Sequence, residues 1–288
     1  MSKRFVYYNA GTLGSRPFII KVNSGADSQF TIPTNSLYTY NFDVITSDGQ
    51  TFSSITGNQL INFSDANTDY IIEISGVFPH WNQNNNAEKL KVLDVMQWGT
   101  IQWLSFEYSY GKCYNWRSSA NDIPDTKLVE DFSHAFRETD FNSSISLWDF
   151  SSTKDMFAIL YSCNLYTKDI VINDTIKGTI SLELLGYSFT SVESKVLKLY
   201  AEELNTIDTF SFQAMNSTEV LEFNEMSISF NVEYFISLVG TELNNLANSV
   251  KDMTGLTSPT LTMTVAQYGS TGFTPALFTN KNWTISQV

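Results

Sequence analysis

The feature that most constrains this fold is a sequence pattern that recurs after 24 residues. Pro124-Asp125, Phe132 and Phe136 have counterparts 24 positions later, at Trp148-Asp149, Met156 and Leu160. The offset returns further on, where Leu197, Leu199, Leu204 and Phe210 are followed by Leu221, Phe223, Ile228 and Tyr234. A fixed period of about 20–30 residues is typical of a solenoid, whose units are too small to bury an apolar face alone and therefore stack. This pattern favours a protein that binds through its surface over one that catalyses in a pocket.

The charge balance argues against several classes of partner. The chain has 30 acidic and 17 basic residues and a net charge of −13. Such a surface repels nucleic-acid phosphates and anionic membranes. We find no local basic patch, so we expect no nucleic-acid partner. No apolar stretch is long enough to cross a bilayer, so we expect no membrane insertion.

The cysteines and the start of the chain bear on where the protein is made. Cys113 and Cys163 are the only cysteines. A disulfide between them is one interpretation; two buried thiols at equivalent repeat positions is the one we expect.

The N-terminal segment has two basic residues, but Asn9 and Gly11 interrupt it before an apolar run develops. This is not the pattern of a secretory signal, and we expect synthesis in the cytoplasm.

The first part of the chain predicts strands. Residues 1–24 contain two short apolar segments, Phe5 to Tyr8 and Pro17 to Val22, and are interpreted as an N-terminal arm. Residues 25–81 show period-two alternation interrupted by turns such as Ser47-Asp48-Gly49. Short strands with frequent turns predict a small antiparallel β-sandwich.

Beyond a polar break at residues 82–87 the periodicity changes. Residues 88–255 are predicted to be a leucine-rich-repeat-like solenoid with parallel strands, and residues 256–288 its C-terminal cap. Within the solenoid, 128–136 and 156–161 have helical apolar spacing, 145–148 looks extended, and the repeat slips between 166 and 195, which indicates an insertion or a variant repeat. A helix is expected over 233–253, ending before Gly255, and extended pieces are expected at 261–265 and 283–285. The expected fold class is β-rich with short helices.

The sequence offers little for catalysis. His80 and His134 are the only histidines, and no glycine elbow frames a serine, so a nucleophilic hydrolase is disfavoured. Nothing selects a carboxylate pair for glycoside hydrolysis, and no phosphate-binding glycine loop is present. Four acidic residues close in sequence resemble solvated turn carboxylates more than a calcium site: Asp122, Asp125, Asp131 and Asp140. We expect no catalytic residue, no metal site and no cofactor.

The tryptophans are the candidates for recognition. A flat aromatic face beside Asn and Asp side chains suits sugar or protein binding, whereas the alternative is that it fills the core. Trp98 and Trp148 lie in repeat motifs and are expected in the core. Trp81 and Trp116 lie in polar surroundings, and we name them as the candidate binding residues.

Several of these stretches resemble a known family. Residues 28–79 resemble the PKD-like sandwich that precedes BspA-type leucine-rich surface proteins, starting with Phe30-Thr31-Ile32-Pro33 and ending with Tyr70 to Pro79. The family's Trp-Gly-Asp-Gly turn is reduced here to Asp48-Gly49. Residues 95–163 resemble the repeats of the same family through Gln97-Trp98-Gly99, Ile101-Gln102-Trp103, Asp122-Ile123-Pro124-Asp125, Phe141-Asn142, Ile145-Ser146, Trp148-Asp149 and Asp155-Met156.

The C-terminal part carries a second resemblance. Residues 196–288 are similar to generic leucine-rich repeats, and Asn280 to Ile285 are similar to the terminal cap of repeat proteins encoded by phages of Bacteroidetes hosts. Together the resemblances imply a PKD-like sandwich, a leucine-rich-repeat-like solenoid and an adhesive, surface-exposed role.

These observations lead to a functional expectation with two alternatives. Family members on cells carry export signals, whereas a virion protein needs none, so we expect a non-enzymatic phage virion component, in the tail or on the capsid. Its partners would be other virion proteins or a host surface receptor, within a homo-oligomer or a larger assembly. The alternatives are a bacterial cell-surface adhesin and a carbohydrate-active enzyme.

Overall fold

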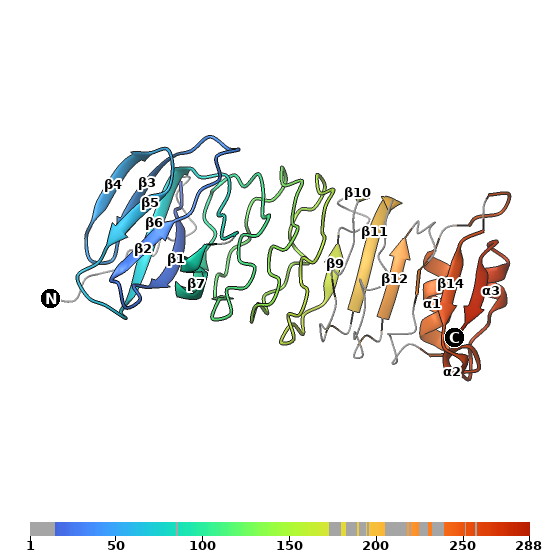
Figure 1. Ribbon diagram of the computed structural model, residues 1–288. Coiled ribbons are helices and arrows are strands. Elements are labelled where there is room, and N and C mark those ends of the chain that lie inside the picture. The colour runs from blue at the N-terminus through green and yellow to red at the C-terminus, as the bar shows by residue number, and fades with distance from the viewer. Residues whose placement is uncertain are drawn as a thin grey trace.

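The protein is an elongated rod with a β-sandwich at one end, stacked coils in the middle and a small α/β unit at the other end (Figure 1). The computed structural model describes residues 15–84, 86–172, 180–182, 189, 194, 196–204, 218, 220–224, 230–231, 239–250, 252–256 and 258–288. The predicted apolar segment Phe5 to Tyr8 lies outside the described residues, as do Phe210, Ile228 and Tyr234 of the repeat pattern.

The N-terminal part consists of two sheets. One has six strands in the order β4-β3-β6-β1-β7-β8, and the other pairs β2 with β5 in antiparallel orientation. Burial alternates along most of these strands, as a sheet with one covered face requires. The strands are β1 (Phe18–Asn23), β2 (Gln29–Ile32), β3 (Asn41–Thr46), β4 (Thr51–Ile55), β5 (Gln59–Asn62), β6 (Asp69–Val77), β7 (Val92–Gln97) and β8 (Arg117–Ser118). The predicted antiparallel sandwich is confirmed.

The boundary predicted for the N-terminal arm is wrong, because residues 18–23 form the strand β1 inside the large sheet. β1 pairs antiparallel with β6 on one side and with β7 on the other. Its inward side chains Phe18, Ile20 and Val22 are fully buried. Three alternating positions are too few in sequence to identify a central strand, and only the pairing of both its edges reveals it.

The polar break at residues 82–87 is not a boundary in the structure, because the sheet crosses it. Strand β7 pairs antiparallel with β1 on one edge and parallel with β8 on the other. β8 belongs to the first coil of the solenoid. The buried apolar residues form one continuous cluster from Phe18 to Trp283. The sandwich therefore covers the N-terminal end of the solenoid core, which a stacked array needs at each end.

The segment before β1 is clamped onto the first coil. The amide of Thr100 donates to the carbonyl of Arg16 at 2.9 Å, and the amide of Arg16 donates to the Thr100 hydroxyl at 3.1 Å. The Asp122 carboxylate accepts from the amides of Trp98 and Gly99, each at 2.9 Å. Backbones approach so closely here that a Cβ at Gly99 would lie 2.3 Å from the carbonyl oxygen of Pro17.

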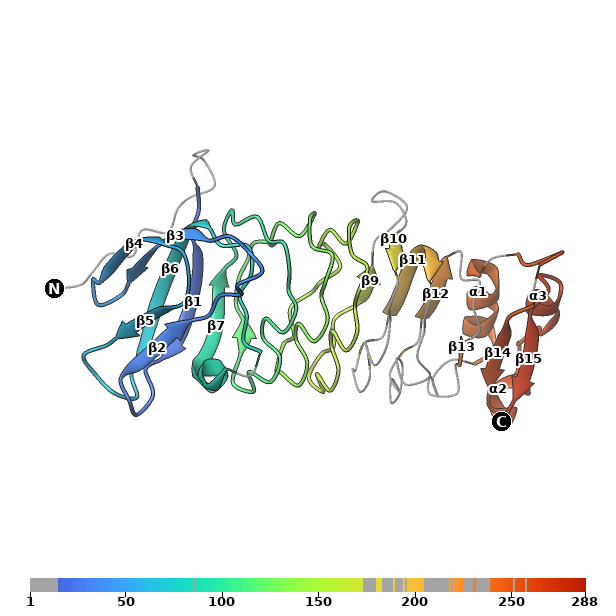
Figure 2. The ribbon, with the colours of Figure 1, turned by 45° about the horizontal axis from the view of Figure 1, so that its top comes forward.

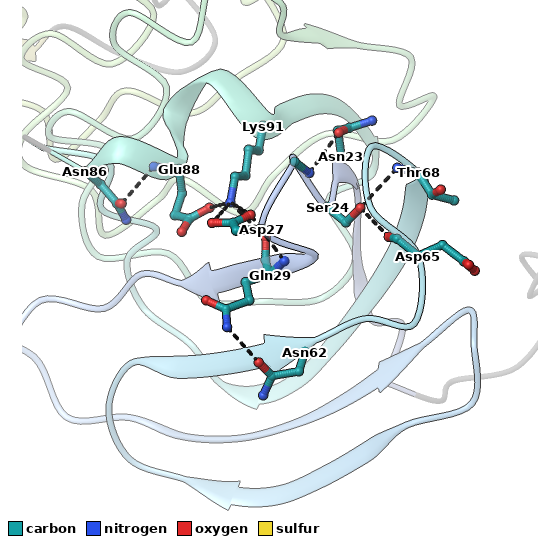
Figure 3. A network of polar contacts seen from close by, with 11 residues as sticks. Asn23, Ser24, Asp27, Gln29, Asn62, Asp65, Thr68, Asn86, Glu88 and Lys91 are labelled. Atoms are coloured by element: carbon teal, nitrogen blue, oxygen red, sulfur yellow. Dashed lines mark hydrogen bonds and ion pairs between the residues drawn. The ribbon is translucent and has the colours of Figure 1, made fainter.

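A second clamp is the lysine-centred network drawn in Figure 3. The ammonium of Lys91, in the short 3-10 helix η1 (Ala87–Lys91), lies 2.7 Å from one oxygen of Asp27 and 3.0 Å from Glu88, and donates to the carbonyl of Gln29 at 3.0 Å. Lys91 thereby links the β1–β2 turn to the start of β7, the strand that leads into the solenoid. The ion pair with Lys91 keeps the pKa of Asp27 below its ordinary value.

Between β8 and β9 the chain forms coils that lie side by side in both views (Figures 1 and 2). We call residues 105–113, 131–139 and 155–163 the ladder segments. Every second amide of one ladder segment donates to a carbonyl of the next at 2.7–3.0 Å. The amides of residues 106, 108, 110 and 112 donate to the carbonyls of residues 131, 133, 135 and 137, respectively. The amides of residues 132, 134, 136 and 138 donate in the same way to the carbonyls of residues 155, 157, 159 and 161. At the start of each segment Ser105, Asp131 and Asp155 accept from the amide two residues on.

The helices predicted over 128–136 and 156–161 are wrong. Each ladder segment contains two residues with φ of 50–63°, namely Tyr108 and Lys112, His134 and Glu138, Ala158 and Ser162. Left-handed residues interrupt a right-handed helix, and here the amides bond to a neighbouring coil. The apolar spacing that indicated helices arises because tight turns also return a side chain to the core after three or four residues.

Strands return in the second half of the solenoid. These are β9 (Ile170–Ile172), β10 (Ile180–Leu182), β11 (Val196–Leu204) and β12 (Val220–Asn224). β11 and β12 are parallel with Leu197 beside Leu221 and Leu199 beside Phe223, so the predicted offset is confirmed as one coil. Both β9 and β10 pair with β11, at different ends of that long strand. This double pairing accounts for the slip in the repeat, because β9 and β10 pair with β11 at different sequence offsets.

The C-terminal end mixes helices with parallel strands. It contains β13 (Phe230–Asn231), α1 (Thr241–Ser249), β14 (Thr260–Met263), α2 (Val265–Tyr268), α3 (Ala276–Thr279) and β15 (Thr284–Gln287). The helix expected over 233–253 is confirmed only over 241–249, where Leu243, Leu246 and Ala247 are buried; it ends at Ser249, and residues 233–238 lie outside the described residues. The expected strands near 261–265 and 283–285 are β14 and β15, which pair in parallel. Among the residues described here, no helix has the length and apolar character to span a bilayer.

Replacing Gly99 by alanine should destabilise the junction strongly. The added Cβ would meet the backbone of residues 16 and 17, and φ is +70°. We expect the free energy of unfolding to fall by roughly 2 kcal/mol or more, measured by urea denaturation. Gly255→Ala has a φ of +81° but open space around it and should cost about 1 kcal/mol. Gly57→Ala, with nothing within 4 Å, should change stability by less than about 0.5 kcal/mol. Equal effects at Gly99 and Gly255 would contradict the clamp.

Candidate binding groove

The two tryptophans named as candidate binding residues lie inside the core. Trp81 and Trp116 are both 0% exposed. Trp116 stacks on Tyr110 with ring centroids 4.2 Å apart, and Trp81 is also near parallel to Tyr110, with ring centroids 6.5 Å apart. The prediction that these two indoles form a contact surface is therefore corrected, since neither presents a ring face to solvent. Asn115 and Arg117 beside Trp116 are exposed, whereas His80 and Gln83 near Trp81 are buried with it.

These rings belong to an aromatic column that runs along the solenoid. Trp116 also stacks on Phe141 at 5.2 Å, and Phe141 stacks on Tyr166 at 6.0 Å. Successive coils thus place a ring at one equivalent position. Trp98 and Trp148, expected in the core, are 3% exposed and meet edge to face at 5.6 Å.

The two histidines are buried and far from a catalytic arrangement. His80 is fully buried, and its Nε2 donates to the carbonyl of Glu107 at 2.8 Å. His134 is 8% exposed and stacks on Tyr108 with ring centroids 4.4 Å apart. Desolvation lowers the pKa of each imidazole to about 4. Both rings therefore pack as neutral groups near neutral pH.

The cysteines and the aspartates have structural roles. Cys113 and Cys163 are free, buried thiols, and the Sγ of Cys163 donates to the carbonyl of Phe136 at 2.9 Å. Asp122 and Asp131 accept backbone amides in turns. Within the part of the chain that the structure describes, no group of three or more His, Cys, Asp or Glu side chains is placed to hold a metal ion.

The strongest candidate for a functional site is an open groove on the ends of the ladder segments. It has a volume of about 520 Å³ and spans consecutive coils. Its lining is Tyr114, Glu138, Thr139, Asp140, Tyr161, Ser162 and Asn164. We call it the tyrosine groove, because a tyrosine from a different coil stands at each side.

The side walls of the groove are held by polar contacts. The hydroxyl of Tyr114 donates to Glu138 at 3.3 Å, and the other oxygen of Glu138 accepts from Nε of Arg137 at 2.7 Å. The guanidinium of Arg137 lies 5.0 Å from the ring centre of Tyr161, within the range of a cation–π contact. Desolvation and the Glu138 carboxylate raise the pKa of Tyr114. A chain of contacts therefore joins the two tyrosine walls across the coils.

The shape of the groove follows from side-chain size at equivalent positions. Tyr114, Asp140 and Asn164 directly follow Cys113, Thr139 and Cys163, which end the ladder segments. Thr139 is buried, and its hydroxyl donates to the carbonyl of Phe136 at 2.7 Å. The small groups between the large Tyr114 and Tyr161 leave the hollow open.

A second, smaller hollow adjoins the first. It has a volume of about 180 Å³ and is lined by Arg137, Phe157, Ala158 and Tyr161. Tyr161 lines both hollows, and the guanidinium of Arg137 lies against its ring. The combined surface presents aromatic rings, hydroxyls, an amide and carboxylates, which are groups for recognition by hydrogen bonding and stacking.

Sequence reasoning missed this groove because its residues are spread over about 50 positions with no motif among them. One signal was present: reading every sequence position against its counterpart one coil later aligns Tyr114 with Asp140 and Asn164. That alignment can be made only when the length of each coil is known, and the number of residues per coil varies between neighbouring coils.

Comparison with known families gives one match. The model of a family described as "Mycoplasma protein of unknown function, DUF285" matches residues 72–196 and 103–234, which together are more than half of the chain. No curated protein and no solved structure matches the chain. The match covers the coils that carry the tyrosine groove, and the match and the stacked coils fit the resemblance to BspA-type repeat surface proteins.

The neutral histidines predict a loss of stability in acid. The folded pKa of His80, about 4, lies below the value of 6.5 for a free imidazole, so the unfolded chain takes up a proton first as the pH falls. Stability should therefore decrease between pH 6.5 and 4, by up to roughly 3 kcal/mol for this residue. Imidazole proton NMR signals should stay unshifted down to about pH 5. His80→Gln should show a shallower decrease in urea denaturation; signals that titrate near pH 6.5 would contradict the burial.

The buried thiols predict slow chemical modification. Burial raises the pKa of Cys163 to about 11 and that of Cys113 further, which keeps both thiols protonated and covered. Native protein should react with Ellman's reagent at least about 100-fold more slowly than protein in concentrated guanidinium. Unfolded, unreduced protein should release two equivalents. Release of none would indicate a disulfide.

Proposed function

The chain belongs to the DUF285 family, and from this membership together with its solenoid and tyrosine groove we propose that it is a non-enzymatic protein that binds a partner through its surface. The single observation that carries this proposal is the groove itself, an open hollow built across consecutive coils from aromatic and polar side chains. Such a surface fixes a partner without enclosing it, whereas catalysis profits from a site that excludes water.

The chemistry of the described side chains supports a binding role over turnover. Both histidines are packed as neutral groups, and the two cysteines are buried with raised pKa values. Glu138 accepts hydrogen bonds from Arg137 and Tyr114, which hold its side chain in place. These settings suit structural packing and hydrogen bonding more than proton transfer.

We place this binding protein in a virion, as a tail or capsid-associated component made in the host cytoplasm, with other virion proteins or a host receptor as partners. The resemblance of residues 280–285 to phage-encoded repeat proteins supports this, and so does the resemblance of the sandwich to a PKD-like module. The net charge of −13 supports protein or host-surface contact over nucleic acid. A rod whose sandwich covers one end of the coils suits anchoring of the protein at that end and display of binding surfaces along the coils.

A bacterial cell-surface adhesin is the second candidate, and the family match is what favours it. BspA-type repeats are carried by surface proteins, and the matched coils are those that bear the groove. The two candidate functions use the same binding surface. They differ in whether a virion or a bacterial cell surface displays the protein.

Mass spectrometry of purified particles and of washed host-cell envelopes separates the two. We expect peptides of this chain in intact, nuclease-treated particles at a defined copy number, and cryo-electron microscopy should place the rod at the particle surface. Detection in envelopes of uninfected cells instead would favour the adhesin. Absence from both fractions would contradict a surface-binding role altogether.

A matched activity test addresses turnover. Purified protein incubated with bacterial polysaccharides should release no reducing ends above a buffer control. Release that disappears in Glu138→Gln or Asp140→Asn would instead identify an enzyme.

A further inference from the structure

We propose that the tyrosine groove binds a neutral saccharide, using the rings of Tyr114 and Tyr161 as side walls and the small polar groups between them as its hydrogen-bonding floor. This inference rests on the proposed binding function and adds to it the chemical class of the ligand.

The dimensions of the groove suit a small ligand. Its volume of about 520 Å³ falls in the range of about 300–1,000 Å³ found for small-molecule sites. It is open along one side, so a longer chain can enter with only a few of its units seated. An oligosaccharide displayed on a host surface meets both conditions.

The tyrosine walls provide the apolar part of the recognition. Tyr114 is 49% exposed, and its hydroxyl is tied to Glu138, so the ring is held in place while one face stays accessible. Tyr161 is half-buried and is braced by the guanidinium of Arg137. A phenol ring offers a flat apolar face with a polar rim, which matches the C–H face of a sugar ring and its equatorial hydroxyls.

The floor provides the polar part. The hydroxyl of Ser162, the amide of Asn164 and the carboxylates of Glu138 and Asp140 line the same hollow, whereas the buried hydroxyl of Thr139 is already bonded to the carbonyl of Phe136. A sugar hydroxyl is both a donor and an acceptor, so it needs a mixture of donors and acceptors around it. Carboxylates accept, an amide does both, and hydroxyls rotate to suit either role.

The charges of the groove select among saccharides. Two carboxylates line it, and Arg137, beside the groove, is already paired with Glu138 at 2.7 Å. Like charges repel sialylated, uronic-acid and sulfated glycans, and the net charge of −13 adds to that repulsion. The ligand is therefore uncharged.

A basic peptide is the competing occupant, and the geometry disfavours it. Both oxygens of Glu138 are engaged, one by Arg137 and one by Tyr114. That leaves Asp140 to attract a cation, in an exposed position where a single ion pair contributes little.

The test uses the full-length protein on a printed array of neutral, N-acetylated, sialylated and sulfated oligosaccharides, followed by titration calorimetry with the best neutral hit and with oligolysine. Tyr114→Ala and Tyr161→Ala should each weaken the neutral hit at least about tenfold. Asp140→Asn removes the exposed carboxylate while keeping a group that bonds to hydroxyls, and it serves as the variant for the oligolysine titration. Leu147→Ala, 67% exposed and outside the groove lining, is the matched control and should change nothing.

Each outcome decides the matter. Binding of neutral sugars that both tyrosine variants lose supports the proposal, provided thermal unfolding shows that the variants are folded. If Tyr161→Ala fails to fold, Tyr114→Ala, at an exposed position, decides alone. No array signal, binding that the tyrosine variants retain, or oligolysine binding that Asp140→Asn abolishes would each overturn it. The proposed surface-binding function is tested separately, by the localisation of the protein in particles or envelopes.

Discussion

The structure depends on hydrogen bonds between consecutive coils. In the ladder segments every second amide donates to the neighbouring coil, and no regular helix or sheet within a coil satisfies those groups. A buried, unpaired amide is costly, so each coil is stable only when its neighbour is in place. The left-handed residues that turn each ladder segment, such as His134 and Glu138, are part of the same arrangement. They direct the backbone groups of one coil toward the next.

The same geometry divides the side chains into an inner and an outer set. Inside, the rings of Tyr110, Trp116, Phe141 and Tyr166 stack into a column that continues to Trp81 beneath the sandwich. Outside, the ends of the ladder segments bring Tyr114, Glu138 and Tyr161 from separate coils into one groove. A rigid interior thus holds an exterior site whose residues have no local reason to meet, and a site on a rigid frame loses little conformational entropy on binding.

The comparison between expectation and structure turns on particular residues. The predicted match of Leu197 with Leu221 is confirmed, because strands in parallel register repeat each apolar position after one full coil. The predicted helix over Phe132 and Phe136 is wrong, because apolar residues spaced by three and four also arise where tight turns return to the core. The predicted surface position of Trp81 and Trp116 is wrong, because it rests on their polar sequence neighbours, whereas both indoles are buried. The sequence does not identify β1 as a central strand, because its two partners are strands distant in sequence.

The sequence by itself determined the stacked architecture: a 24-residue period of apolar positions, alternation in the first 80 residues and a low share of charge are enough to require coils beside a sandwich. It also determined that the two cysteines, Trp98 and Trp148 would be core, since they lie in repeat positions. Only the tertiary structure decided where the sandwich ends and the solenoid begins, because a β-sheet joins strands without regard to their order in the chain. It also decided the groove, because a surface made of residues one coil apart exists only after every hydrogen bond between those coils has set their register.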